Sequence, residues 1–385
     1  WMKPKSVGRA LSNPFSKNRL HYEPKGVCLI IAPWNYPFQL VMSPLISAIA
    51  AGNCVIVKPS ELSGATSAVI HEIINETFDQ NEIACFEGDA NVSTALLSLP
   101  FDHIFFTGSP AIGKVVMAAA AKHLTSVTLE LGGKSPAVID PEYSIDKAVE
   151  RIMFVKQFNA GQICTNVDYL FVHESKLQAF IQAAAAWVQE HVPDIHSKDY
   201  TSVIDERAFQ RLVHSLADAE AKGASLINLN QQEPDAATRK FPLTLVLNSN
   251  DEMEIDTRET FGPILMVKTY QKPEEVVDYI VQRDRPLAFY PFSNNKSLVE
   301  LYISRVMSGG VSVNDALFHV GQHDLPFGGV GASGMGHYHG YEGFLTFSKM
   351  RPVFYQAGFS SLKFLAPPYG KFANWLLNLL IRIKS

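Results

Sequence analysis

One cysteine, Cys164, stands among small and polar residues in the segment FNAGQICTN, residues 158–166. A glutamate upstream, Glu130, lies beside a glycine pair in TLELGGKSP, and a second one downstream, Glu259, lies in RETFGPI. A thiol that attacks carbon, together with carboxylates that take up a proton, indicates covalent catalysis. The alternative is plain: a lone cysteine is more often a small buried residue than a nucleophile, and a glutamate is more often a surface carboxylate.

Seven segments that follow one another along the chain weigh against that alternative. They are APWNYP, KPSE, FTGS, LELGGK, GQICT, ETFGP and LPFGGVGASGMG. In this order they make the chain resemble the aldehyde dehydrogenase superfamily, from its first residues to about Arg351. Residues 314–347 resemble the class 3 branch and, within it, the bacterial coniferyl aldehyde dehydrogenases. The resemblance implies NAD(P)-dependent oxidation of an aldehyde to a carboxylic acid, through a thiohemiacetal and then a thioester on the cysteine.

The resemblance assigns catalytic roles to Cys164, Glu130 and Asn35. Asn35 ends a predicted strand, where its amide and the Cys164 backbone N–H would form an oxyanion hole, each donor contributing roughly 2.7–4 kcal/mol. Without the resemblance, Asn35 would be interpreted as a turn residue before Pro37. Glu130 would activate the water that attacks the thioester, and Glu259 is the alternative base. Cys164 needs a lowered pKa to react as a thiolate near neutral pH, and we hypothesise that the positive nicotinamide ring helps.

Contacts with the cofactor are also implied by the resemblance. Lys58 and Glu61 would bind ribose hydroxyls, and the Glu61 carboxylate favours NAD because a 2′-phosphate would meet like charge. NADP stays an alternative, since class 3 relatives often take both. Glycines between a strand and a helix, in FTGSPAIG, let a pyrophosphate approach the backbone, although this pattern alone fits a plain turn. The full predicted set is Lys58, Glu61, Gly108, Ser109, Gly113, Glu259 and Phe261, and no metal site is predicted.

An aromatic substrate pocket is predicted at Tyr36, Phe158 and Phe318. Such walls suit aromatic and medium- or long-chain aliphatic aldehydes alike, and the resemblance favours an aromatic one such as coniferyl aldehyde. Two rivals remain open. A CoA-acylating dehydrogenase is disfavoured by Glu130, because such relatives tend to lack that glutamate. A catalytically impaired binding or scaffold paralogue is disfavoured by the intact predicted site.

Short apolar runs alternate with helical patterns from residue 23 onward, which is typical of a parallel sheet covered on both faces. Strands are predicted at 26–33, 53–59, 83–89, 103–109, 127–133, 169–173, 241–247, 263–270 and 309–315, and helices at 38–51, 63–78, 111–123, 146–158, 176–191, 209–222 and 298–307. Residues 231–240 are predicted to form an exposed loop. The predicted fold is α/β with two doubly wound domains. A Rossmann-like cofactor domain spans 23–131 and a catalytic domain spans 132–330. The resemblance implies a small β-arm for oligomerisation that combines 1–22 with part of 341–355.

Composition sets outer limits on function. The 385 residues suffice for two or three domains, and a net charge of −5 gives no indication of nucleic-acid binding. Four scattered cysteines fit a reducing compartment, and we find neither a signal peptide nor an apolar run of about 18 residues, so a cytoplasmic location is expected. The class 3 resemblance implies a homodimer. Family members usually carry several helices before a stretch like WMKP, so we expect the cofactor domain to lack their cover.

The tail, residues 356–385, has a separate pattern. No acidic residue follows Glu342, whereas six bases do: Lys349, Arg351, Lys363, Lys371, Arg382 and Lys384. A helix here would place Phe372, Trp375, Leu376, Leu379 and Ile383 on one face, with Asn374, Asn378 and Arg382 on the other. Such a helix either docks on its own dimer, which is the commoner case, or lies peripherally on the inner face of an anionic membrane.

Overall fold

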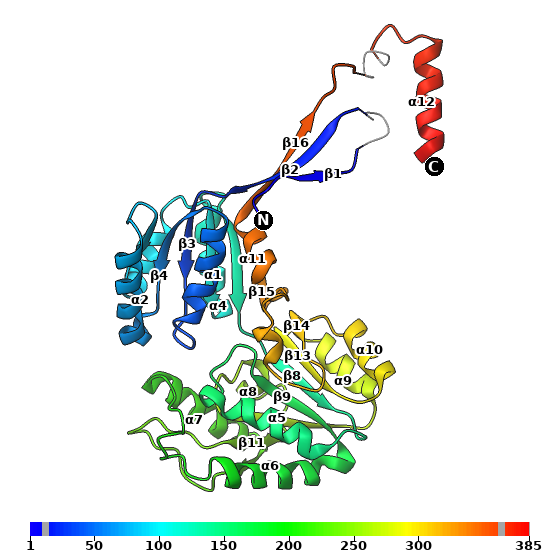
Figure 1. The fold of residues 1–385 in the computed structure, drawn as a ribbon. Helices are drawn as coiled ribbons and strands as arrows, with labels where there is room; N and C mark the ends of the chain where they lie inside the picture. Colours follow the sequence, from blue (N-terminus) through cyan, green and yellow to red (C-terminus); the bar gives the residue numbers. More distant parts are fainter. Residues whose placement is uncertain (10–14, 361–365, 385) are drawn as a thin grey trace.

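The chain folds into two α/β lobes and a projecting β-arm. A computed structural model describes residues 1–9, 15–360 and 366–384. Figure 1 shows the two lobes, the arm projecting away from them, and the C-terminal helix drawn beyond the end of the arm. The predicted α/β class is therefore confirmed.

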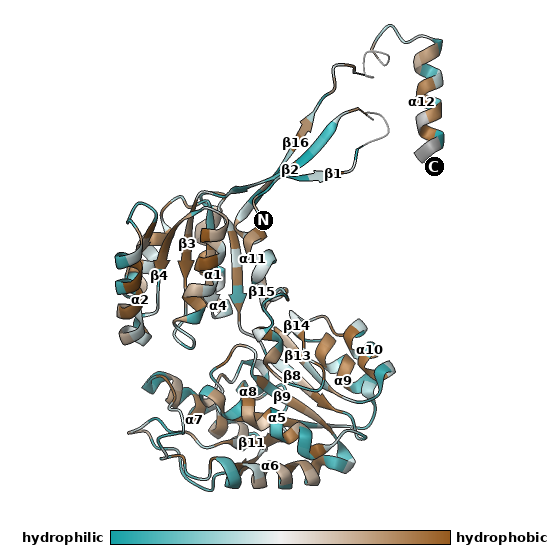
Figure 2. Ribbon diagram, in the orientation of Figure 1, coloured by the Kyte–Doolittle hydropathy of each residue, from teal (hydrophilic) through white to brown (hydrophobic). Residues whose placement is uncertain are grey.

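The first lobe contains a six-stranded sheet in the order β15-β7-β6-β3-β4-β5. Its strands are β3 (Val27–Ile31), β4 (Cys54–Lys58), β5 (Ile83–Cys85), β6 (His103–Gly108), β7 (Ser126–Leu131) and β15 (Gly334–Met335), and its helices are α1 (Gln39–Ala50), α2 (Gly64–Thr77), α3 (Ala90–Leu97) and α4 (Pro110–Ala121). Residues 28–31 of β3 are buried because helices cover both faces of the sheet, and Figure 2 shows this strand in the colour of hydrophobic residues. One expectation was incomplete: β15 pairs antiparallel with β7 and comes from far downstream in the chain.

The second lobe contains a seven-stranded sheet in the order β10-β11-β12-β9-β8-β13-β14. Its strands are β8 (Ser135–Ile139), β9 (Val167–His173), β10 (Ser225–Asn228), β11 (Thr244–Leu247), β12 (Ile264–Tyr270), β13 (Ala288–Phe292) and β14 (Gly310–Val311). Its helices are α5 (Ile145–Gln157), α6 (Leu177–His191), α7 (Glu206–Ala221), α8 (Glu254–Thr257), α9 (Pro273–Val281) and α10 (Lys296–Arg305). All neighbours are parallel except β10, which is antiparallel to β11.

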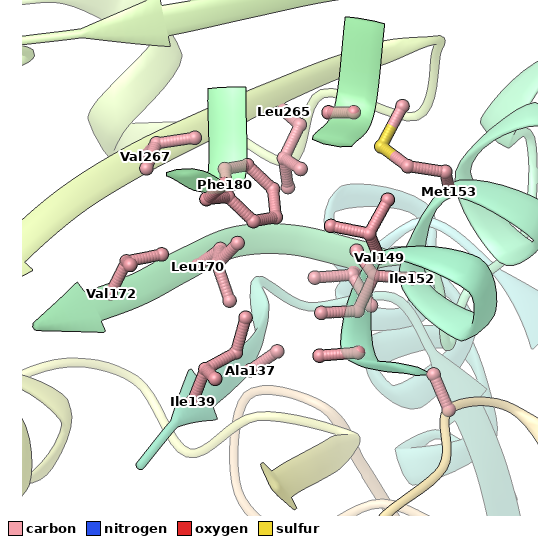
Figure 3. Close-up of a cluster of buried hydrophobic side chains, with 14 of the residues drawn as sticks. Ala137, Ile139, Val149, Ile152, Met153, Leu170, Val172, Phe180, Leu265 and Val267 are labelled. Carbon is pink, nitrogen blue, oxygen red and sulfur yellow. The ribbon is translucent and has the colours of Figure 1, made fainter. Parts of the chain in front are cut away.

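Figure 3 shows how the core of this lobe forms. Val149, Ile152 and Met153 on one face of α5 point toward Leu170 on β9, with Phe180 of α6 beside them. The apolar residues of α5 recur at helical spacing, so burial of this face fixes the helix on the sheet. The position of α5 matters for function because the Cys164 segment follows it directly.

Two inner strands of this sheet, β8 and β13, were not predicted. Each contains a proline, Pro136 or Pro291, and a proline normally argues against a central strand because it lacks an N–H to donate. In β8 the register with β9 shifts between Ser135 and Pro136, which accommodates the missing donor. Helices α3 and α9 were also missed.

The arm is a three-stranded antiparallel sheet, β1-β2-β16, made of Lys5–Val7, Lys17–Pro24 and Ser348–Tyr355. It pairs the start of the chain with a segment more than three hundred residues later, as Tyr22 opposite Met350 illustrates. Helix α11 (Gly340–Thr346) leads into β16, and helix α12 spans Lys371–Lys384. Residues 10–14 of the predicted arm lie outside the described residues, and the proposed domain boundaries and subunit contact stay predictions.

Candidate active site

The segment that carries Cys164 leaves α5 in a short 3-10 turn, Phe158–Gly161, whose backbone is strained. Asn159, Ala160 and Gly161 have φ values of 53°, 51° and 69°. The left-handed region is costly for residues other than glycine, so surrounding contacts must hold the loop. Gly161 also needs to be glycine for space, since a Cβ there would lie 2.3 Å from the carbonyl oxygen of Gly262.

Asn35 is brought to this loop from the end of β3. Its Nδ2 donates to the carbonyl of Gln162 at 3.1 Å, and Asn159 Nδ2 donates to the carbonyl of Asn35 at 3.1 Å. Gln162 in turn donates through Nε2 to the carbonyl of Asn159 at 2.9 Å. A carboxamide has two N–H donors, so this bond leaves Asn35 capacity for a substrate oxygen. Asn35 and the Cys164 loop, far apart in sequence, are thus hydrogen-bonded neighbours.

Glu130 lies on β7 with only 3% of the residue exposed. Neither carboxyl oxygen has a hydrogen-bond partner among the described residues. Burial raises the pKa of Glu130 well above its usual value, because an ionised carboxylate loses its hydration there. Burial therefore favours the neutral form of this carboxyl group.

The Cys164 thiol is not activated by the residues around it. Burial, then Glu259, then Glu130 raise its pKa to about 12, although the backbone N–H groups of Cys164 and Thr165 lower it. The expected lowering is thus not supplied by the chain alone, because negative charge nearby disfavours a thiolate. Because the charges of Glu259 and Glu130 shift the pKa of the thiol, both predicted carboxylates lie close enough to act on it.

Glu259 reaches the glycine pair that follows Glu130. A Cβ added at Gly132 would lie 2.1 Å from its Oε2, so the absence of a side chain there makes room for the carboxylate. Burial and then Asp168 raise the pKa of Glu259 to about 8, against lowering by the Gly133 N–H and by Lys134. Glu259 therefore titrates in the range where enzymes work, which suits a proton acceptor.

Asp168 and Lys134 form hydrogen bonds with the segment on either side of Glu259, and neither residue was predicted from the sequence. Lys134 Nζ lies 3.0 Å from Asp168 Oδ2 and also donates to the carbonyls of Ile255 and Arg258 at 2.8 and 3.0 Å. Thr260 Oγ1 donates to Asp168 Oδ1 at 2.5 Å. The available signal was a carboxylate inside the apolar strand β9, because a buried charge requires a partner.

Four of the predicted cofactor residues, Lys58, Glu61, Gly108 and Ser109, lie at or just after the carboxyl ends of β4 and β6. Lys58 is buried and donates through Nζ to Glu61 Oε2 at 2.7 Å, while the Glu61 side chain is 44% exposed. Although burial raises the pKa of Glu61, the Lys58 hydrogen bond and charge produce a net lowering, so the carboxylate is ionised. Ser109 caps α4 by accepting from the Ile112 N–H at 3.4 Å.

The glycines of FTGSPAIG have a structural reason that the sequence did not reveal. A Cβ at Gly113 would lie 2.7 Å from Leu131 of β7, and one at Gly108 would lie 2.5 Å from the Phe106 ring. The packing of α4 on the sheet therefore already requires a glycine at position 113. The neighbouring Phe106 ring requires one at position 108. Phe261 lies edge-to-face against Trp34 with centroids 5.6 Å apart.

A pocket of about 300 Å³ opens beside the Cys164 loop. It is lined by Asn35, Tyr36, Gln157, Phe158, Asn159, Asp199 and Thr201. Phe158 stacks on Phe154 at 5.7 Å, and Phe154 stacks on Phe318 at 6.4 Å, all three being substantially exposed. Tyr36 and Phe158 thus line the pocket. Phe318 does not line it but is connected to it by the stack through Phe154, a residue that was not predicted.

The model of the aldehyde dehydrogenase family matches residues 4–353. The chain belongs to the aldehyde dehydrogenase family. Its relatives include a probable coniferyl aldehyde dehydrogenase of Pseudomonas aeruginosa, 44% identical over 96% of this chain and 78% of the relative. Another is the 4,4′-diaponeurosporen-aldehyde dehydrogenase of Staphylococcus aureus, 42% identical over 97% of this chain and 81% of the relative.

Solved aldehyde dehydrogenase structures share the fold. The substrate-bound state of Staphylococcus aureus AldH has a TM-score of 0.93 and 40% identity, covering 99% of this chain and 82% of that one. Betaine aldehyde dehydrogenase of the same organism, a point mutant in complex with NAD+, has a TM-score of 0.83 and 25% identity, covering 92% and 73%. This aldehyde dehydrogenase is thus an enzyme of an NAD(P)-dependent family.

The described part of the chain contains neither a membrane-spanning helix nor a cluster of metal-ligating side chains. Over 1–9, 15–360 and 366–384, no helix combines the length and apolar character needed to cross a membrane. Within the same ranges, His, Cys, Asp and Glu side chains form no group of three or more that could hold a metal ion.

Proposed function

We propose that this enzyme oxidises an aromatic aldehyde such as coniferyl aldehyde, or a long-chain aliphatic one, to its carboxylic acid. The pocket beside the Cys164 loop carries this proposal, because a stack of aromatic side chains extends from it. A flat conjugated aldehyde fits stacked rings, and a long apolar chain fits the same walls. The two relatives described above are named for coniferyl aldehyde and for 4,4′-diaponeurosporen-aldehyde.

The chain's own residues account for the covalent steps. Cys164 Sγ forms a bond to the aldehyde carbon while its proton leaves for a nearby carboxylate, and the Asn35 amide with the Cys164 N–H stabilises the oxyanion. When bound, NAD(P) would supply the hydride acceptor needed for oxidation of the carbon–sulfur adduct to a thioester. Glu130 takes a proton from water, the resulting hydroxide attacks the thioester, and the bond to Sγ breaks to release the acid. Glu259 is the alternative acceptor.

The residues present fit a dinucleotide. Thr107 Oγ1 and both Glu130 carboxyl oxygens are buried without a hydrogen-bond partner among the described residues, which leaves polar atoms for a ligand or water to satisfy. Lys58 and the exposed, ionised Glu61 would hold the ribose hydroxyls, Ser109 and the start of α4 the pyrophosphate, and Phe261 would pack near the nicotinamide. The Glu61 carboxylate favours NAD over NADP by repelling a 2′-phosphate.

The first test is NADH formation with coniferyl aldehyde and with decanal, beside Cys164→Ala. We expect turnover with at least one substrate and none in the variant. Phe154→Ala should raise KM for coniferyl aldehyde more than KM for acetaldehyde, which is too small to reach the stack. Acyl-CoA formed only when CoA is added would favour the CoA-acylating rival, and NAD binding without turnover across an aldehyde panel would favour the impaired paralogue.

We further propose that the arm forms a homodimer contact and that α12 contacts an anionic membrane. Phe372 and Trp375, on the predicted apolar face of α12, are 54% and 58% exposed, and the tail after Glu342 is basic while the whole chain is acidic. Exposed apolar groups beside bases suit an anionic lipid surface. For Ile383, which is on the predicted apolar face, the structure describes the helical backbone but not the side chain. Cosedimentation with phosphatidylglycerol vesicles, lost on deletion of 371–385, supports this contact; a dimer that dissociates on that deletion supports docking on the dimer instead.

A further inference from the structure

Lys156 is a buried charge that the proposed mechanism does not use. It lies in the last turn of α5, directly before the Cys164 loop, and its side chain is completely inaccessible to solvent. Lysine is almost never fully buried unless it is paired, because an ammonium loses its hydration there. Its position at a helix C-terminus helps, since the partial negative charge of the last carbonyls favours a cation.

The contact of this ammonium ties two elements together. Lys156 Nζ donates to the carbonyl of Val167 at 2.9 Å. Val167 is the first residue of β9, so the bond joins the end of α5 to the beginning of β9 and closes the base of the loop between them. Within the loop, the buried Tyr290 Oη donates to the carbonyl of Thr165 at 2.6 Å. A loop with consecutive left-handed residues persists only when such contacts hold it.

The charge of Lys156 also acts on the neighbouring loop. Burial lowers its pKa to about 8, while Asp168 raises that pKa most among the nearby charges, Lys134 lowers it and Glu259 raises it. Attraction between two groups is reciprocal, so a charged Lys156 favours an ionised Glu259. The titratable groups that act on Glu259, or on which it acts, are Asp168, Lys134, Arg211, Cys164 and Lys156.

We propose that Lys156 is a positioning residue of the reaction: its ammonium closes the base of the Cys164 loop, and its positive charge favours the carboxylate form of Glu259. This inference rests on the proposed function, since it assigns Lys156 an effect on the nucleophile and on one of the two candidate bases. A misplaced loop slows attack on the aldehyde, and loss of the buried charge makes Glu259 harder to ionise.

The test compares Lys156→Met with Lys147→Met, an exposed lysine of the same helix, in the full chain. Met keeps the length of the side chain and removes the ammonium. We expect kcat of Lys156→Met to fall by about tenfold or more. We also expect the rise of kcat/KM for NAD with pH to move to higher pH, because Glu259 then loses its proton only at higher pH. The Lys147→Met variant should match the wild type in kcat and in the pH dependence of kcat/KM for NAD.

Lys156→Gln separates the two effects, because its amide can donate a hydrogen bond but carries no charge. It should recover part of kcat and keep the displaced pH profile. Circular dichroism and thermal melting establish that each variant is folded; if the Met variant does not fold, the same measurements on the Gln variant decide.

Two results overturn the inference. One is a folded Lys156 variant with wild-type kcat and pH profile; the other is a fall in kcat with an unmoved pH profile, which a purely structural role would produce. Cys164→Ala tests the nucleophile separately. Turnover lost in that variant together with wild-type behaviour in Lys156→Met rejects this inference and leaves the proposed function intact, whereas turnover kept in Cys164→Ala rejects the proposed function.

Discussion

Replacing Glu130 by Gln separates the two halves of the proposed reaction. The acylating half does not need the Glu130 carboxylate if Glu259 takes the thiol proton, whereas hydrolysis of the thioester needs a base beside water. Loss of a positioned general base slows a step by about 10²–10⁴-fold. In stopped-flow absorbance, Glu130→Gln should produce a burst approaching one NADH per subunit, followed by a steady rate lower by that factor. Mass spectrometry after acid quench should find the acyl group on Cys164.

The same substitution has an expected effect on stability whose sign follows from burial. Because burial raises the folded-state pKa of Glu130 above 4.5, folding is favoured at low pH and is penalised as pH rises above the unfolded value. The penalty grows by about 1.4 kcal/mol per pH unit until the folded-state pKa is reached. A glutamine side chain is neutral at every pH and therefore carries no such penalty. Glu130→Gln should unfold at a higher denaturant concentration than the wild type at pH 8 and lose that advantage near pH 4.

Steady turnover of Glu130→Gln within about threefold of the wild type, without a burst, would refute the assignment of the deacylating base. Glu259 would then be the main acceptor, and Glu259→Gln should show the burst instead. If the difference in stability between Glu130→Gln and the wild type is the same at pH 4 and pH 8, the pKa of Glu130 is not raised on folding. Its burial and its unpartnered oxygens argue against that result.

Three further outcomes are expected. Alkylation of Cys164 by iodoacetamide without cofactor should be slow at pH 7.5 and keep rising beyond pH 9, because its pKa is raised to about 12; a plateau below pH 9 would contradict this. Gly161→Ala, at φ 69° with a carbonyl oxygen 2.3 Å from the new Cβ, should destabilise the fold by about 1–3 kcal/mol and lower kcat, whereas Gly64→Ala, with nothing within 4 Å, should do neither. Asp168→Asn should lower the free energy of unfolding in urea by about 3 kcal/mol because it leaves the half-buried Lys134 ammonium without its ionic partner, and a loss below about 0.5 kcal/mol would show that the pair is not stabilising.

The sequence by itself determined the family, the fold class and most of the helices and strands. Segments such as GQICT and LELGGK are short and contiguous, so they can be recognised without knowing how the chain folds. Apolar runs like that of β3 and the periodic face of α5 reflect burial, which is a property of each segment's own pattern. The pattern fails where a local rule is overridden, as at Pro136 of β8 and Pro291 of β13, where tertiary context places a proline in an inner strand.

The tertiary structure alone decided which groups act on one another. Asn35 donates to Gln162, and Gly334 of β15 pairs with Glu130, across separations that no local pattern encodes. The protonation states also depend on the fold: burial and nearby carboxylates raise the pKa of the Cys164 thiol, although its flanking residues give no sign of this. Burial and the distances between charges are properties of the packed molecule, because they depend on what all the other segments place around a residue.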